Sequence, residues 1–161
     1  MNIRAAKAEE LARIMQIYRA AKAYMDATGN ETQWESGYPS EEMIREDIEE
    51  GRLYVVEESG EAHAVFYFFN GADETYSKID HGNWLNDEPY GVIHRVASDG
   101  ALHGVMRVCA EFCLRTVKNL KIDTHEKNKT MQNALERIGF VRCGIVYLPN
   151  GDSRIAYQIC R

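Results

Sequence analysis

The sequence predicts one mixed α/β domain in which about four helices cover a central sheet of about seven strands. The first observation is the order of segments, β α α β β β α β α β β, read from the spacing of apolar residues. The second is that three strands follow one another in the middle of the chain, which suits antiparallel pairing. The third is a later strand, helix, strand passage, which implies a right-handed crossover and a parallel pair. With 161 residues, the chain is expected to form a single domain over 1–161.

The N-terminal part of the chain is expected to hold a short strand and two helices. Residues 2–5 form the strand, and apolar residues three and four apart predict an amphipathic helix over 8–27. Residues 28–40 are polar and rich in turn formers, so they end this helix. Ser40 can cap a second helix, whose acidic first turn suits the helix dipole, and Gly51 lies where that helix should stop.

The middle of the chain is expected to form strands and one long loop. Two runs over 53–58 and 62–70 predict strands joined by a Ser-Gly turn. Residues 71–89 lack any periodicity, and irregular segments of this length are usually functional or mobile. A further strand is expected over 90–98.

The last third of the chain alternates helices with strands. A glycine at position 139 marks the end of the second of these helices, and a Pro-Asn-Gly-Asp turn separates the final two strands. The expected elements are a helix over 104–117, a strand over 121–124, a helix over 127–138, and strands over 140–148 and 153–159.

Composition argues against two classes of protein. The net charge is −6 and the basic residues are scattered among acids, so a nucleic-acid binder with a basic stripe is not expected. No apolar run approaches the roughly twenty residues of a membrane helix. The N-terminus lacks the apolar stretch and cleavage site of a signal peptide, which predicts a cytoplasmic protein.

The four cysteines, at positions 109, 113, 143 and 160, lack the Cys-x-x-Cys or Cys/His spacing of a zinc site. A cytoplasmic chain keeps its thiols reduced. We therefore expect all four to be small buried apolar residues, and we expect no bound metal.

The segment from His94 to Cys113, HRVASDGALHGVMRVCAEFC, reads as a strand end, a loop with two glycines and a helix start. Such a loop can hold an anion, because the first amides of a helix have no partner within the helix. The alternative is an ordinary turn, since Asp99-Gly100 is a common turn pair.

A second motif lies further along the chain, where Asn128 opens a helix that ends in Gly139-Phe140. This motif, the glycine loop and the order of elements resemble the GNAT superfamily of N-acetyltransferases, most specifically over about residues 90–145. The resemblance implies a central mixed sheet with helices on both faces. It also implies that the Asn side chain hydrogen-bonds the pantetheine arm of coenzyme A, and that residues Arg95–Ser98 pair with pantetheine like an added strand.

The resemblance implies acetyl-CoA as co-substrate. Its pyrophosphate would face the amides around Gly104, with positive charge from His103 and Arg107. The loop departs from the family, because Leu102 and Met106 stand where the family has glycines. The expected cofactor-binding residues are Val96, Ser98, His103, Gly104, Val105, Met106, Arg107 and Asn128.

Both catalytic positions of the family are changed in this chain. Val92 stands where a carboxylate usually acts as base, and His94, on the same face of the strand, is the expected substitute; its alternative is a hydrogen-bonded core residue. Leu135 stands where the family has a tyrosine as general acid, and Tyr147 is the expected substitute, although a thiol can leave without an acid. His125 is a further candidate for proton transfer.

Aromatic residues in irregular segments are the candidates for the acceptor site. Trp34 and Trp84 can wall a site for a cation or an apolar group, with Glu35 near the first of them, or they can anchor their loops to the core. Tyr90, at the start of the strand that leads into the glycine loop, carries the same two alternatives.

We therefore expect an N-acetyltransferase that moves an acetyl group from acetyl-CoA to an amine of a small molecule or peptide, by direct attack in a ternary complex. The first alternative is a catalytically degenerate GNAT-like module that binds CoA, another ligand or a protein. The second is a phosphate-binding domain unrelated to CoA. The expected partners are acetyl-CoA and an amine acceptor, without nucleic acid or membrane, and a homodimer is compatible with the sequence.

Overall fold

Seven strands form one continuous sheet in the computed structural model of the chain, which describes residues 1–161. Four α-helices and two short 3-10 turns complete the structure, and the predicted fold class is confirmed. The strands are β1 (Asn2–Ala5), β2 (Leu53–Glu58), β3 (Glu61–Asn70), β4 (Gly91–Ser98), β5 (Asn119–Thr124), β6 (Val141–Tyr147) and β7 (Ser153–Cys160). The helices are α1 (Leu11–Ala27), α2 (Glu41–Glu49), α3 (Val105–Cys113) and α4 (Lys129–Ile138), and the turns are η1 (Ala8–Glu10) and η2 (Glu74–Tyr76).

Several boundaries differ from the prediction by a few residues, and three of these differences have a local reason. The helix expected from residue 8 begins as the turn η1, because the Glu10 side chain accepts a hydrogen bond from the Lys7 amide. The helix expected to reach residue 117 ends at Cys113, whose carbonyl accepts from both the hydroxyl and the amide of Thr116 in a turn that follows the helix. The strand expected from residue 121 begins at Asn119, a buried polar residue that an apolar pattern does not detect.

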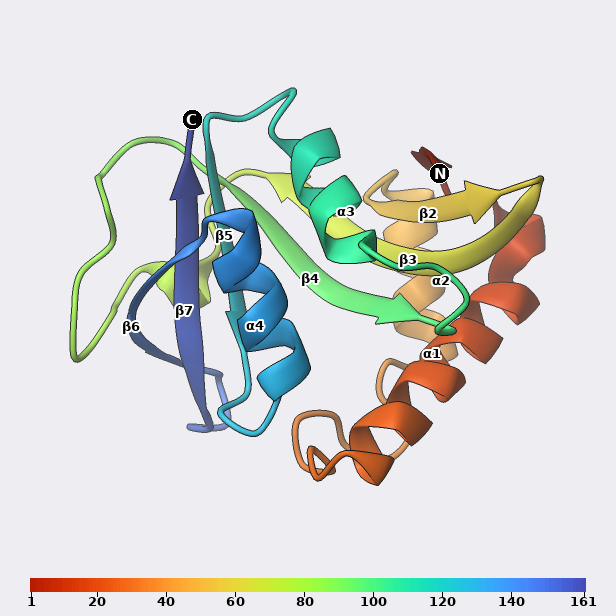
Figure 1. Cartoon of the computed structure of the whole chain (residues 1–161), viewed down its shortest axis with the longest axis horizontal. Helices are drawn as coiled ribbons and strands as arrows, with labels where there is room; N and C mark the ends of the chain where they lie inside the picture. The colour runs from red at the N-terminus through yellow and green to blue at the C-terminus, as the bar shows by residue number, and fades with distance from the viewer.

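The strand order is β1-β2-β3-β4-β5-β7-β6, and every neighbouring pair is antiparallel except β4 and β5. The predicted parallel pair is therefore present. It is very short, because only Gly91 and Val92 of β4 pair with β5. Beyond these residues the two strands diverge, as Figure 1 shows.

A bulge in β4 lies just beyond the point of divergence. Tyr67 of β3 pairs with His94 and Val65 pairs with Ala97, so two residues of β4 oppose one residue of β3. Arg95, inside the bulge, has a φ of 51°, in the left-handed region. A bulge bends its strand and increases the local twist, and here it lies where β4 parts from β5.

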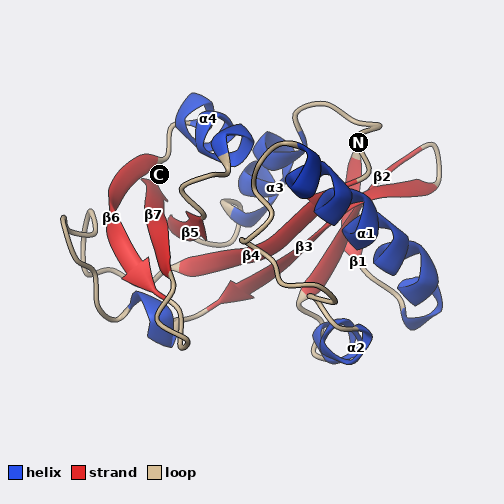
Figure 2. Ribbon diagram, turned by 90° about the horizontal axis from the view of Figure 1, so that it is seen from below, coloured by secondary structure: helices blue, strands red, loops and turns tan.

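Helices cover both faces of the sheet. Adjacent residues of a strand point to opposite faces, and Val55 packs with α1 and α2 whereas Val56 packs with α3 and α4. Figure 1 shows α3 and α4 in front of the strands, and Figure 2 shows α2 on the other side. None of the helices has the length and apolar character needed to cross a membrane.

The irregular segment over residues 71–89 is docked on the same face as α1 and α2, over the other half of the sheet. Tyr76 is buried there against Val92 of β4. The backbones of Asp80 and Ile145 exchange two hydrogen bonds, of 2.9 and 2.8 Å, which fix the segment to β6. The Trp84 indole donates to the Tyr76 carbonyl at 2.9 Å, so the segment is also tied to itself.

All four cysteines are free thiols. Cys109 and Cys113 of α3 and Cys143 of β6 are buried, as predicted. The prediction is wrong for Cys160, which is exposed because it is the last residue of β7.

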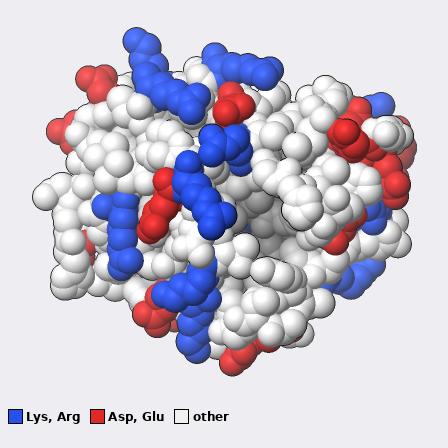
Figure 3. Space-filling view, in the orientation of Figure 1, with Lys and Arg blue, Asp and Glu red and all other residues white.

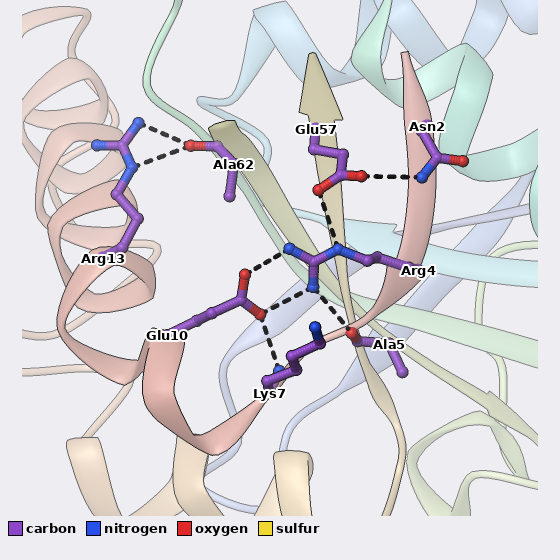
Figure 4. Close-up of polar contacts among 8 residues, drawn as sticks. All are labelled: Asn2, Arg4, Ala5, Lys7, Glu10, Arg13, Glu57 and Ala62. Atoms are coloured by element: carbon purple, nitrogen blue, oxygen red, sulfur yellow. Dashed lines mark hydrogen bonds and ion pairs between the residues drawn. The ribbon is translucent and has the colours of Figure 1, made fainter. Parts of the chain in front are cut away.

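The edge strand β1 is held by the side chain of Arg4, which Figure 4 shows between two carboxylates. Its Nε donates to Glu57 of β2 at 2.9 Å, and two other nitrogens donate to Glu10 of η1 at 2.6 and 3.0 Å. The hydrogen bonds from Arg4 lower the pKa of Glu10 below its ordinary value, although partial burial opposes this effect. The edge strand and the start of the first helix are therefore joined through one guanidinium.

Arg4→Met should lower the free energy of unfolding at pH 6 and have much less effect at pH 3. Because the pKa of Glu10 is lowered in the folded state, the pair stabilises the fold above the ordinary value of 4.5, and this stabilisation is lost as the pH falls through the folded-state pKa. Urea unfolding at the two pH values measures the effect. Arg45→Met removes an exposed pair with Glu41 and is the matched control, with little change expected at either pH. An equal loss at both pH values for Arg4→Met would contradict this account.

Candidate active site

The divergence of β4 and β5 creates two hollows of similar size. The first, which we call the bulge cavity, has a volume of about 620 Å³ and lies among the 32–38 loop, the bulge of β4, the end of β5 and the β6–β7 turn. The second, the loop groove, has a volume of about 640 Å³ and lies between α1, the glycine loop and α4. The two hollows meet at a neck, lined by Met25, Val96, Asn128 and Met131.

The loop groove offers main-chain donors at the start of α3. Gly104 precedes this helix with a φ of 73°, which a side chain would oppose, and it provides no side-chain cap. The amides of Val105, Met106 and Arg107 consequently have no hydrogen-bond partner within the chain. The side chains of Val105 and Met106 are buried in the core. Met106, which stands where the family has a glycine, therefore does not cover the backbone amides on the groove side of this turn.

Positive charge borders the loop groove. Arg107 lines the groove and donates to the carbonyl of Arg137 at 3.2 Å, which places both arginines on one side of it. Figure 3 shows a hollow on this face of the molecule with Lys and Arg side chains along one side. His103 is exposed in the groove wall, and the Ser98 hydroxyl accepts from the Gly100 amide at 3.1 Å within the glycine loop. Groove and charge together suit a bound anion.

Asn128 spans the neck with its side chain. Its Oδ1 accepts from the Met131 amide at 3.0 Å and caps α4, while its Nδ2 donates to Oε1 of Gln33 at 2.9 Å. A second bridge joins the hydroxyls of Tyr24 on α1 and Thr130 on α4 at 2.9 Å. The sequence pattern identified Asn128, but nothing in it pointed to Gln33, a polar residue in a polar loop, as its partner.

His94 lines the bulge cavity and is paired with Asp73. The distance from its Nε2 to Oδ2 of Asp73 is 2.6 Å, and this hydrogen bond lowers the pKa of Asp73 against the opposing effect of burial. An ionised carboxylate can only accept hydrogen bonds, so Nε2 carries the proton and Nδ1 is the basic nitrogen. Asp73 lies at the start of the irregular segment, and the sequence did not reveal it as a partner of His94.

A second polar pair lies next to this one. The hydroxyl of Tyr76 donates to Oδ2 of Asp123 on β5 at 2.7 Å. Burial, followed by the charge of Asp123, raises the pKa of Tyr76 well above its ordinary value, so the phenol stays protonated. Asp123 lines the bulge cavity and therefore presents a carboxylate, already accepting one hydrogen bond, close to His94 and Asp73.

The structure separates the predicted acceptor-site residues. Trp34 is buried in the wall of the bulge cavity, where its ring packs against Tyr18 and Tyr38. Trp84 and Tyr90 line neither hollow, and their rings lie 3.9 and 3.8 Å from Nζ of Lys121. Burial lowers the pKa of Lys121 to about 8. These two aromatic residues thus anchor the 71–89 segment.

The remaining candidates for proton transfer lie outside both hollows. Tyr147 is an exposed residue of β6 and lines neither of them, so the structure does not bring it to His94. His125 also lines neither, and its Nδ1 accepts from the Lys127 amide at 3.0 Å. Val92 and Leu135, at the positions that are catalytic in the family, are buried in the core.

Comparison with known proteins identifies the family. Neither a protein-family model nor a curated protein matches the chain. Among solved structures, an acetyltransferase of the GNAT family from Streptococcus agalactiae is 32% identical with a TM-score of 0.89, over 99% of this chain and 95% of that one. A GNAT-family acetyltransferase from Listeria monocytogenes shares the fold, with 20% identity and a TM-score of 0.71 over 99% of this chain and 94% of that one. Another from Bacillus cereus also shares it, with 21% identity and a TM-score of 0.63 over 99% of this chain and 96% of that one. By its fold and its likeness to the streptococcal protein, the chain belongs to the GNAT family of acetyltransferases.

Proposed function

We propose that this protein transfers an acetyl group from acetyl-CoA to an amine, by direct attack in a ternary complex. One observation carries the proposal: two hollows of similar size meet at the neck between α1, β4 and the start of α4, one with free amides and arginines and the other with a paired histidine. Such an arrangement suits two substrates that meet end to end, and holding two reactants together supplies much of a rate enhancement.

The loop groove fits acetyl-CoA by the chemistry of its donors. The unpartnered amides of α3 and the side chains of Arg107 and His103 would hold the pyrophosphate. The edge of β4 that faces β5 has no strand partner after Val92, so Val96 and Ser98 would hold the pantetheine arm through their backbone. Asn128 would contact the same arm at the neck.

The bulge cavity would supply the base. Acetyl-CoA, when bound, provides a thioester carbonyl as the electrophile. Nδ1 of His94 takes a proton from the acceptor amine, and Asp73 fixes the ring and stabilises its positive charge. Backbone amides near Val96 would stabilise the developing oxyanion. A thiol has an ordinary pKa of about 8.5 and can depart as a thiolate, so no acid is assigned.

A second candidate function is a GNAT-like module that binds CoA without catalysis. The burial of Val92 and Leu135, at the family's two catalytic positions, favours it. Incubation with acetyl-CoA and a panel of amines separates the two functions through the release of free thiol. We expect thiol release that depends on the amine. Tight CoA binding without any release would favour the module instead.

Asp73→Asn should lower kcat about 100-fold or more while the protein stays folded. An amide at this position can donate to Nε2 of His94, which moves the ring proton to Nδ1 and removes the base. His94→Gln should cause a similar loss and remove the acid limb of the pH–rate profile. Glu74→Gln, at an exposed neighbour of Asp73, is the control and should leave kcat unchanged. A normal acid limb in His94→Gln would exclude His94 as the base.

Asn128→Ser should weaken CoA binding about tenfold while α4 stays capped. A serine hydroxyl can still accept from the Met131 amide, but it cannot replace the Nδ2 donor. Titration calorimetry with CoA measures the dissociation constant, and thermal unfolding checks the cap. Asn133→Ser changes an exposed asparagine on the same helix that makes no side-chain hydrogen bond, and it should bind CoA normally. Unchanged affinity in Asn128→Ser would remove Asn128 from the cofactor site.

A further inference from the structure

Arg154 of β7 is a buried cation in the wall of the bulge cavity. Its exposed fraction is 5%. The guanidinium donates to two backbone carbonyls, that of Ser153 at 2.9 Å and that of Gln33 at 3.0 Å. These oxygens satisfy some of its N–H groups but do not neutralise its charge, and no carboxylate of the chain forms an ion pair with it.

A buried charge without a counter-charge is costly, and proteins usually pair such groups. An arginine cannot avoid this cost by losing its proton. The charge of Arg154 also affects a neighbouring residue: the pKa of His125 is lowered, first by burial and next by Arg154. The site therefore carries a positive charge that the folded chain leaves uncompensated.

Two of the other charged groups around the cavity are already paired with an ionisable partner of the chain. Arg95 donates to Asp47 of α2 at 2.7 Å and lies over the Tyr67 ring. Asp73 is paired with His94. Asp123 accepts from the neutral Tyr76 hydroxyl, so its negative charge has no counter-charge within the chain. The remaining carboxylates of the wall, those of Glu35 and Asp152, belong to exposed residues at its rim. Arg154, which is buried, and Asp123, which is half-buried, are thus the two opposite charges of this cavity that a ligand can neutralise.

Strand register places the complementary groups on one face of the sheet. Asp123 pairs with Ala156, and Arg154 lies two residues before Ala156, so its side chain leaves β7 on the same face. Ala156 packs with Val92, and His94 lies two residues after Val92 on β4. A carboxylate, a base and an uncompensated cation therefore face the same cavity.

We propose that the acceptor is an amino acid or a similar zwitterion, whose carboxylate binds Arg154 and whose amino group lies between Asp123 and His94. This inference rests on the proposed acetyl transfer. An arginine fork suits a carboxylate, and the carboxylates opposite it suit an ammonium group. Simple amines, polyamines and lysine side chains lack the negative group and would leave Arg154 unpaired.

The reaction balances with this acceptor. The ammonium form first loses one proton to Nδ1 of His94, which passes it to solvent. The amine nitrogen then forms a bond to the thioester carbon, the carbon–sulfur bond breaks, and sulfur leaves with the electron pair. The second proton leaves the nitrogen as the amide forms and ends on the thiol or in solvent. The products are an N-acetyl amino acid and free CoA.

Matched acceptor pairs test the inference on the wild-type protein. Each pair is an amino acid and its carboxamide, which share the amine and differ in the carboxylate. The carboxamide has the less basic amine and hence more of the reactive neutral form, so amine basicity alone would favour it. We expect kcat/KM to be at least tenfold higher for the free amino acid. Equal values, or a preference for the carboxamide, would overturn the inference and leave acetyl transfer intact.

Variants of Arg154 locate the effect. Arg154→Gln should abolish the preference for the free amino acid, and Arg154→Lys, which keeps the charge, should retain part of it. Arg142→Gln, at an exposed arginine of β6, is the control and should keep the full preference. If Arg154→Gln does not fold, the inference is still tested by kcat/KM for the acceptor pairs on the wild-type protein and on Arg154→Lys. A full preference in a folded Arg154→Gln protein would overturn the role of Arg154.

A binding measurement separates this inference from the proposed function. Titration calorimetry of the wild-type protein with free amino acids and their carboxamides requires no turnover. If the free amino acids bind, their carboxamides do not, and Arg154→Gln loses the binding, the inference is supported. If in addition no acceptor causes thiol release, only the proposed acetyl transfer is overturned. No binding and no turnover of any amino acid would overturn the inference.

Discussion

The early end of the pairing between β4 and β5 is the constraint on which the rest of this structure depends. Two residue pairs join these strands, and the bulge at Arg95 then carries β4 away from β5. Backbone groups that a regular ladder would have used are left free in the middle of the sheet. Unpaired backbone groups are costly where water is excluded, so such a gap persists only if the surrounding structure holds it open.

The helices α1 and α2 hold the bulge of β4 in place. The hydroxyl of Tyr18 on α1 donates to the Arg95 carbonyl at 3.0 Å, and Asp47 on α2 accepts from the Arg95 guanidinium. Burial raises the pKa of Asp47, and the charge of Arg95 opposes that rise. Nε of Arg95 remains buried without a partner, which is the kind of local cost that proteins tolerate at functional sites. The same side chains thus build the core and shape the cavity.

The sequence predicted what depends on local pattern and missed what depends on contacts between distant segments. Local residue patterns located the four α-helices and the seven strands, although not the 3-10 turns η1 and η2. The motif from Asn128 to Phe140 is also local, so it pointed to the family. The partners of the site come from far apart: Asp73 reaches His94, and Gln33 reaches Asn128 across 95 positions. Such pairs leave no periodic signal. Tryptophan in a loop was equally ambiguous, since Trp34 walls a cavity and Trp84 covers a buried lysine.

A crystal structure of the protein with bound CoA tests the central claim most directly. We predict density along the free edge of β4, with the pyrophosphate against the first turn of α3 and the thiol end at the neck beside Val96. CoA bound outside the gap between β4 and β5, or no bound CoA at a saturating concentration, would contradict this claim.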